Sequence, residues 1–271
     1  MSSARRVRKR GLHAFTLCLV VLSAATAWAQ APTASALGSL EATSNTGNQP
    51  PPTPPDTGVH AFFSNLEHAV VALPSVQNLW IAGIGGAGAL AAHAVDDTFN
   101  QRLQRTGDFF RAGNILGGSA LQMGAALGTY VVGRWQDYPK AAHAGMDLLH
   151  AQIIAEGLTQ GIKVSVRRER PAGTGFAFPS GHAAVTVATA TVIQRHFGIV
   201  WSLPLYGTAA YVAMSRLHDN RHWLSDVVFG VAVGEVAGRT VTRRHGRSNY
   251  TVVPVYTPGE MALLIMRTAE E

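Results

Sequence analysis

Cysteine is nearly absent from the sequence, which contains one among 271 residues, Cys18. Because Cys18 lies in the apolar part of a predicted signal peptide, the mature chain is expected to form neither a disulfide nor a thiolate metal site. Charged residues are also scarce, at 14%, while 47% of the residues are hydrophobic and the mean hydropathy is +0.11. This composition lies between that of a typical soluble domain and that of a protein with many membrane spans. Composition alone therefore leaves open whether the protein is soluble or integral to a membrane.

The N-terminal segment has the three parts of a secretory signal peptide. Five Arg and Lys residues occupy positions 5–10, Leu12–Ala25 is mostly apolar, and Ala27-Trp28-Ala29 is a cleavage site of small residues. Residues 1–29 are therefore predicted to be removed on export. The alternative is a retained membrane anchor, which the short apolar run and the clear cleavage site disfavour. Their removal takes away five basic and no acidic residues and lowers the formal net charge from +6 to +1. The basicity of the full chain thus gives no sign of a nucleic-acid partner.

The rest of the chain divides into a linker, a helical domain and a tail. Residues 30–59 are rich in Ala, Ser, Thr, Gly and Pro, cannot bury a core, and are predicted to form a disordered linker. The long apolar segments that follow favour helices over strands by their length and their Ala and Leu content. They cover residues 62–73, 78–95, 112–133, 142–162, 182–195, 198–214 and 223–239. The sequence thus predicts an all-α domain over 60–247, and a tail over 248–271 whose two β-rich runs around Pro258-Gly259 favour a β-hairpin.

Two tracts at the ends of predicted helices carry groups that bind anions. The first, KVSVRRERP, holds Lys163, Arg170 and Pro171 at the end of the helix predicted over 142–162. Taken alone, it is typical of a basic helix C-terminus that complements the helix dipole. The second, FPSGH, is a Pro-Ser-Gly turn into the next helix, where Ser180 is a good N-cap and free backbone N–H groups can hold an anion. Each tract by itself has an ordinary structural explanation.

The third tract, SRLHDNRHWLSD at 215–226, crowds charged side chains between two apolar segments. His222 and Asp226 are four residues apart at the start of the last core helix, so they project from one face and the carboxylate can orient the imidazole. A single His/Asp pair with this spacing is more often structural than catalytic. Its occurrence together with two anion-binding tracts favours a catalytic role.

Together the three tracts resemble the signature of the type 2 phosphatidic acid phosphatase (PAP2) superfamily, which reads K-x6-R-P, P-S-G-H and S-R-x5-H-x3-D. Residues 163–171, 179–182 and 215–226 fill every fixed position in this order, and three ordered tracts are far more specific than one short motif. The resemblance implies a helical bundle of the PAP2/haloperoxidase type, with about six core helices, that hydrolyses phosphate monoesters or lipid phosphates. The short gap between the first and second tracts leaves little room for an elaborate loop over the site.

The resemblance also implies which residues bind the phosphate. Lys163, Arg170 and Arg216 are expected to bind the phosphoryl oxygens as cations. Ser180 and the Gly181 N–H group are expected to add hydrogen bonds from the turn. None of the three tracts is expected to contact the alcohol part of the ester, so they do not indicate which leaving group the substrate carries.

Three further residues are assigned catalytic roles by the resemblance. His222, oriented by Asp226, is expected to attack phosphorus and form a phosphohistidine, and His182 to protonate the leaving alkoxide and then activate water. The same three side chains could instead be a two-histidine, one-carboxylate iron site. Three cations in one pocket would repel a divalent ion and attract an oxyanion. The hydrolysis is therefore predicted to need no metal and no other cofactor.

Two alternatives to a phosphatase are retained. In the related vanadium haloperoxidases the pocket holds vanadate, an anion shaped like phosphate, but no counterpart of their long N-terminal helical region is recognised here. A catalytically silent scaffold or binding protein with the same fold is the other alternative, and the intact signature argues against it. Fold alone does not separate these functions.

Charge along the predicted helices bears on location. If the helices from residue 112 onwards run up and down, the three tracts meet at one end and several basic residues at the other, which would then face the cytoplasm. The segment 142–162, however, carries Asp147, His150 and Glu156, which are costly in lipid. We therefore expect an exported protein, periplasmic or in the inner membrane, with its active site facing the periplasm and a phosphorylated small molecule or lipid as substrate. Membrane association and oligomeric state are left open.

Overall fold

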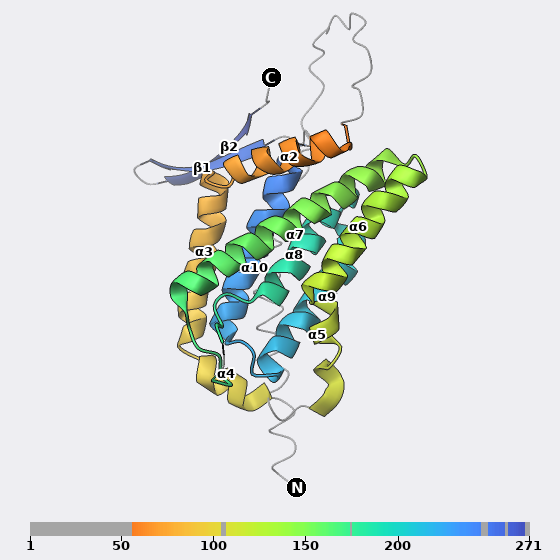
Figure 1. Cartoon of the computed structure of the whole chain (residues 1–271). Helices are drawn as coiled ribbons and strands as arrows, with labels where there is room; N and C mark the ends of the chain where they lie inside the picture. The colour runs from red at the N-terminus through yellow and green to blue at the C-terminus, as the bar shows by residue number, and fades with distance from the viewer. Residues whose placement is uncertain (1–55, 104–106, 174, 245–248, 258–259, 269–271) are drawn as a thin grey trace, which may run out of the picture.

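Helices make up most of the chain that the structure describes. The computed structural model covers residues 56–103, 107–173, 175–244, 249–257 and 260–268, so the predicted signal peptide and most of the predicted linker lie outside the described residues. The first helices are α2 (Val59–Val71), α3 (Val76–His93), α4 (Asp96–Leu103), the 3-10 turn η1 (Gly107–Phe110), α5 (Gly113–Leu116) and α6 (Ser119–Trp135). They are followed by α7 (Pro139–Val166), α8 (Gly181–Phe197), α9 (Ile199–His218), α10 (Leu224–Val241) and the 3-10 turn η2 (Thr242–Arg244) (Figure 1).

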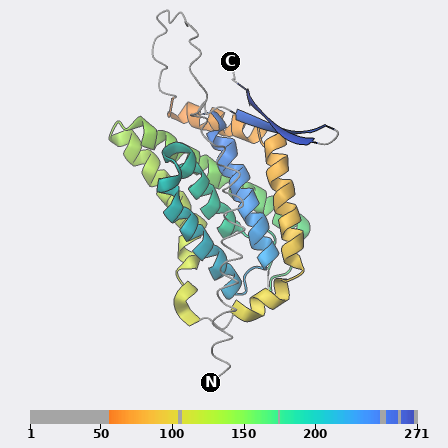
Figure 2. The ribbon, with the colours of Figure 1, turned by 180° about the vertical axis from the view of Figure 1, so that it is seen from behind.

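Helix α10 lies at the centre of the bundle, between α3 on one side and α8 on the other (Figures 1 and 2). α8 also packs against α7 and α9, and α7 packs against α6. α2 crosses one end of the bundle, whereas α4 and α5 lie at the opposite end (Figure 1). The largest apolar cluster is formed by buried side chains of α7, α8 and α10, and a second cluster joins α3 to α9 and α10.

The predicted all-α bundle is confirmed, with differences at the ends of its elements. The apolar segment 112–133 is divided between α5 and α6, because the chain turns at Gly117 and Gly118. α4 was not predicted, since its sequence DDTFNQRL contains no apolar run. The predicted C-terminal hairpin is present as β1 (Asn249–Thr257) and β2 (Glu260–Thr268), which pair in antiparallel register.

Large apolar side chains are exposed on the outside of several helices. They include Val59, Phe63, Leu79, Trp80, Leu90, Leu121, Leu127, Trp135, Val200, Trp201 and Leu203. Among the helices that the structure describes, none is by itself both long and apolar enough to cross a membrane. α2 and α3, which meet at a bend of 63°, satisfy that criterion as a pair.

A row of glycines on α10 brings this helix unusually close to α8. Gly230, Gly234 and Gly238 recur every fourth residue and therefore lie on one face of the helix. A Cβ atom on Gly230 would lie 2.6 Å from the Ser180 carbonyl oxygen, and one on Gly238 would lie 2.7 Å from Thr191 Cβ. A Cβ atom on Gly234 would overlap the carbonyl oxygen of Ala184. The two backbones can approach this closely only because these positions have no side chain.

Gly234→Ala should therefore destabilise the protein although alanine favours helices. Forcing a methyl group against the α8 backbone should lower the free energy of unfolding by about 1–3 kcal/mol, as overpacking does in other cores, and thermal unfolding will measure the decrease. Gly128→Ala on α6 is the matched control, since nothing lies within 4 Å of a Cβ atom there. It should raise stability by about 0.5–1 kcal/mol through helix propensity. An equally stable Gly234→Ala variant would contradict the close contact of α8 with α10.

Candidate functional site

The structure brings all three tracts to one end of the bundle. Lys163 lies in the last turn of α7, and its Nζ donates hydrogen bonds to the carbonyl oxygens of Phe176 and Ala177, both at 3.2 Å. This contact closes the loop that connects α7 to α8. The loop then enters α8 at Ser180, whose N–H donates to the carbonyl oxygen of Asp226 at 2.9 Å. The second tract is thus bonded directly to the third.

His222 and Asp226 lie in the interior at the start of α10. His222 is 4% exposed and Asp226 is fully buried. The chain between α9 and α10 folds back on itself, since the N–H groups of Arg221 and His222 both donate to the carbonyl oxygen of Arg216. Asn100 of α4 donates from its amide nitrogen to the carbonyl oxygen of His222 at 3.2 Å. His222 Nδ1 is 3.6 Å from Asp226 Oδ2, which is an ion-pair distance but longer than a hydrogen bond.

Arg216 is held from two sides in the last turn of α9. It is 4% exposed, and its Nη1 donates to Asn114 Oδ1 at 3.0 Å. Its Nη2 forms a salt bridge with Asp219 Oδ2 at 3.0 Å. Because a guanidinium is planar and both of its ends are bonded, the direction of its remaining donors is fixed.

Ser180 and His182 stand at the N-terminus of α8. Ser180 is fully buried and caps the helix, its Oγ accepting from the Ala183 N–H at 3.5 Å. His182 also interacts with the backbone of Asn114. A Cβ atom on Gly117 would lie 3.0 Å from His182 Cδ2, so the chain between α5 and α6 packs against the imidazole. The α5 region therefore supports both His182 and Arg216.

Burial and mutual repulsion lower the proton affinity of the basic groups. Burial lowers the pKa of Lys163 to about 8, and the charge of Arg170 acts in the same direction. Burial likewise lowers the pKa of His182 to about 4, assisted by Arg216. The pKa of His222 is also lowered by burial, and Asp226 opposes this change. At neutral pH both imidazoles are therefore uncharged while the lysine and arginine side chains remain cations.

An arrangement of this kind suits an anion rather than a metal ion. Lys163, Arg170 and Arg216 are close enough for their charges to act on the two histidines and on one another. Among the described residues, no group of three or more His, Cys, Asp or Glu side chains is placed to hold a metal ion. A tetrahedral oxyanion would offset the positive charge, and the neutral imidazoles could exchange protons with it or attack it.

The signature did not indicate several residues that shape this site. Asn114 contacts Arg216 from the short helix α5, and Asp96 and Asn100 approach from α4. Arg168 lies inside the first tract but not at a fixed position of the signature, and its guanidinium donates to Asp226 Oδ1 at 2.7 Å. Only the tertiary contacts distinguish Arg168 from its exposed neighbour Arg167.

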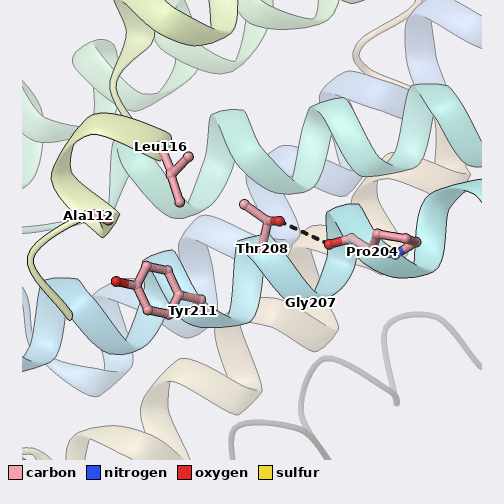
Figure 3. A pocket seen from close by; sticks show the side chains of 6 residues that line it. All are labelled: Ala112, Leu116, Pro204, Gly207, Thr208 and Tyr211. Carbon is pink, nitrogen blue, oxygen red and sulfur yellow. Dashed lines mark hydrogen bonds between the residues drawn. The ribbon is translucent and has the colours of Figure 1, made fainter. Parts of the chain in front are cut away.

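An apolar pocket of about 400 Å³ lies beside the site, between α5 and α9 (Figure 3). It is lined by Ala112, Leu116, Pro204, Gly207, Thr208 and Tyr211. Leu116 directly precedes Gly117, which packs against His182, and Tyr211 lies five residues before Arg216 on α9. The pocket therefore adjoins the end of the bundle where the charged side chains meet.

The chain is similar in sequence to one protein family and to several known proteins. A family model described as the PAP2 superfamily matches residues 144–250. The chain is 40% identical over 86 residues to a lipid A 1-phosphatase of Porphyromonas gingivalis, which covers 30% of the chain but only 19% of that protein. It is 32% identical over 127 residues to a decaprenylphosphoryl-5-phosphoribose phosphatase of Mycobacterium tuberculosis, covering 43% of the chain and 67% of the relative.

Among solved structures, a transmembrane PAP2 type phosphatidylglycerolphosphate phosphatase from Bacillus subtilis is similar to the chain. The sequence identity is 16% and the TM-score is 0.43. The similarity covers 68% of this chain and 94% of that one.

The lowered pKa of Lys163 predicts how anion binding depends on pH. Above about pH 8 the ammonium loses its proton, whereas inorganic phosphate, partly a monoanion at pH 7, only gains negative charge as the pH rises. Because a cation is lost from the site, phosphate should bind at least about tenfold more weakly at pH 10 than at pH 7. Lys163→Arg keeps its charge over this range, and its affinity should change by less than about threefold. Titration calorimetry with inorganic phosphate measures both. Lys140→Arg, at the other end of α7, is the control and should behave as the unsubstituted protein. If the phosphate affinity of Lys163→Arg falls between pH 7 and pH 10 as much as that of the unsubstituted protein, Lys163 does not bind the anion.

Proposed function

Since the chain belongs to the PAP2 superfamily, we propose that it is a phosphatase that hydrolyses phosphate monoesters through a phosphohistidine intermediate. The observation that carries the proposal is the convergence of Lys163, Arg170 and Arg216 on two histidines held neutral by burial. Three cations compensate the charge of a phosphoryl group, and a neutral imidazole provides the nucleophile.

In the first step, His222 Nε2 attacks phosphorus and the bond to the ester oxygen breaks. Asp226 lies on the Nδ1 side of the ring, which leaves Nε2 as the nucleophilic atom. His182 donates a proton to the departing alkoxide. Its pKa of about 4 applies to the empty site, and a bound phosphate dianion raises that pKa because it stabilises the imidazolium.

In the second step, water attacks the phosphohistidine and inorganic phosphate leaves. His182, now neutral, accepts a proton from the water, and His222 is released as the leaving group. Lys163, Arg170 and Arg216 stabilise the charge on the equatorial oxygens in both steps. These cations also disfavour a divalent ion in the same pocket, so we propose that hydrolysis proceeds without a metal.

We further propose that the substrate is a lipid phosphate. The pocket between α5 and α9 is apolar and adjoins the charged end of the bundle, so a hydrocarbon chain can lie there while the phosphate reaches the cations. The names of two relatives, lipid A 1-phosphatase and decaprenylphosphoryl-5-phosphoribose phosphatase, also refer to phosphorylated lipids.

Exposed tryptophans support association with a membrane. Trp80 lies near the start of α3, Trp135 ends α6 and Trp201 lies in the first turn of α9, and these residues are 68%, 83% and 71% exposed. All three stand at the end of the bundle opposite the candidate site. Trp135 lies just before the start of α7 and Trp201 just after the end of α8, and α3 begins at the same end, beside α2 (Figure 1). Exposed tryptophans are typical of the interface between lipid and water. We propose that this end contacts the inner membrane and that the site faces the periplasm; flotation with phospholipid vesicles tests the membrane contact.

His222→Ala should abolish hydrolysis of an aryl phosphate and of phosphatidate, in a buffer that contains EDTA. Without the nucleophile, kcat should fall by roughly a thousandfold or more, and phosphate release measures the decrease. Radiolabelled phosphate should be trapped on the unsubstituted protein after an alkaline quench, which preserves phosphohistidine, and not on the variant. His60→Ala, on the exposed surface of α2, is the control. Undiminished turnover in His222→Ala would refute the assigned nucleophile.

Gly207→Leu should reduce activity toward lipid substrates selectively. Nothing lies within 4 Å of a Cβ atom at Gly207, so the leucine side chain can occupy the pocket without disturbing α9. The kcat/KM for long-chain phosphatidate should fall about tenfold or more, consistent with the loss of about 1.4 kcal/mol of apolar contact, while kcat/KM for an aryl phosphate should stay within about twofold. Gly128→Leu, an equally open position on α6, is the matched control. Equal effects on both substrates would argue against a hydrocarbon chain in this pocket.

A further inference from the structure

The Asp226 carboxylate is held by a network that extends beyond His222. Its Oδ1 accepts a hydrogen bond from Arg168 Nη1 at 2.7 Å, and its Oδ2 accepts one from the Trp223 N–H at 2.8 Å. The same Nη1 of Arg168 donates to Ser225 Oγ at 2.6 Å. Both oxygens of the carboxylate are thus bonded to groups other than His222, whose Nδ1 lies 3.6 Å from Oδ2.

Asp96 completes this network on the far side of the guanidinium. Its Oδ2 accepts hydrogen bonds from Arg168 Nη2 and from Ser225 Oγ, each at 2.7 Å. Its Oδ1 accepts the Ser225 N–H at 2.9 Å. Asp96 is the first residue of α4, so a segment far away in the sequence is tied to the start of α10.

Charge alternates along the row Asp226, Arg168, Asp96. The two carboxylate side chains are 0% and 4% exposed, and that of Arg168 is 23% exposed. A carboxylate removed from water costs several kcal/mol unless it is paired. Burial by itself would raise the pKa of Asp96, but the hydrogen bonds that it accepts, that from Arg168 first, outweigh burial and lower the pKa. Asp96 is therefore an anion that shares one guanidinium with Asp226.

We propose that Arg168 and Asp96 are positioning residues of the reaction, which fix the rotation of the Asp226 carboxylate and determine how much of its negative charge acts on His222. This inference rests on the function proposed above. The positive charge of Arg168 offsets part of the negative charge of Asp226. Asp226 can therefore orient His222 without favouring its protonation, and the imidazole stays neutral as a nucleophile. Asp96 limits this effect of Arg168 on Asp226, because the negative charge of Asp96 offsets part of the guanidinium charge.

Other charged groups face this network from the elements packed around it. Lys163 of α7, Arg170 of the following loop and His182 of α8 act on His222. At the end of α3, His93 Nδ1 lies 2.9 Å from Asp96 Oδ2 and 3.1 Å from Arg168 Nη2. These groups are unchanged in the variants below, so differences between variants report on the network itself.

Two variants that each remove one charge of the network should shift the pH profile in opposite directions. Arg168→Gln removes the cation, so Asp226 stabilises the His222 imidazolium more strongly and the acid limb of kcat should move up by about one pH unit. Asp96→Asn removes the anion, so the guanidinium opposes that imidazolium more strongly and the limb should move down by about half a unit. In Arg168→Gln, kcat should also fall about tenfold or more while KM changes less than about threefold, and Arg168→Lys should recover part of kcat.

Matched controls separate this effect from a general loss of charge or fold. Arg167→Gln and Asp97→Asn alter the exposed neighbours of the two residues and should leave the profile unchanged. Inorganic phosphate should bind Arg168→Gln as tightly as the unsubstituted protein. If Arg168→Gln fails to fold, Asp96→Asn tests the proposal alone: a downward shift of the acid limb supports it, and an unchanged limb contradicts it.

An NMR titration of the His222 ring, identified by the signal lost in His222→Gln, measures the same shifts without turnover. An inactive unsubstituted protein would then refute the phosphatase function, and the titration would still test the network. Shifts in the same direction for Arg168→Gln and Asp96→Asn, no shift in either, or kcat within about twofold of the unsubstituted value in both would overturn the proposal.

Discussion

The close contact between α8 and α10 is the constraint on which the candidate site depends. Glycines at positions 230, 234 and 238 allow the two backbones to approach until no Cβ atom would fit between them. At the end of this contact the Ser180 N–H bonds to the Asp226 carbonyl oxygen. The turn that begins α8 and the turn that begins α10 therefore have a fixed mutual position. His182 directly follows the first turn and His222 lies in the second, so the two imidazoles are close enough to interact.

A concentration of positive charge in a partly buried place is the second feature of the site. Lys163, Arg170 and Arg216 repel one another and lower the proton affinity of the imidazoles near them. Carboxylates at the rear offset part of this repulsion, since Asp219 pairs with Arg216 and Asp226 lies beside His222. The front of the site keeps its excess of positive charge, which an oxyanion would neutralise. The fold thus provides an electrostatic preference for an anion before any substrate is bound.

The two ends of the bundle differ in their chemistry. The end with the candidate site gathers the charged side chains and is closed by α4, α5 and the loop after α7, which bring Asp96, Asn114 and Arg168 against the signature residues. The other end presents exposed tryptophans and is crossed by α2. An antiparallel bundle allows this separation because every second connection lies at the same end. A polar reaction and an apolar contact surface can therefore coexist in one small domain.

The sequence by itself determined the helical class, the C-terminal hairpin and the three tracts, because periodicity, capping and motif spacing are local properties of the chain. It did not indicate the α8–α10 contact, although the repeat of glycine every fourth residue between 230 and 238 was available as a signal. Nor did it distinguish Arg168 from Arg167, or Asp96 from Asp97, since adjacent residues of one type differ only in the direction that the folded backbone gives them. Only the tertiary structure decided that Arg168 and Asp96 point inward to Asp226, because that choice depends on contacts between segments more than fifty residues apart.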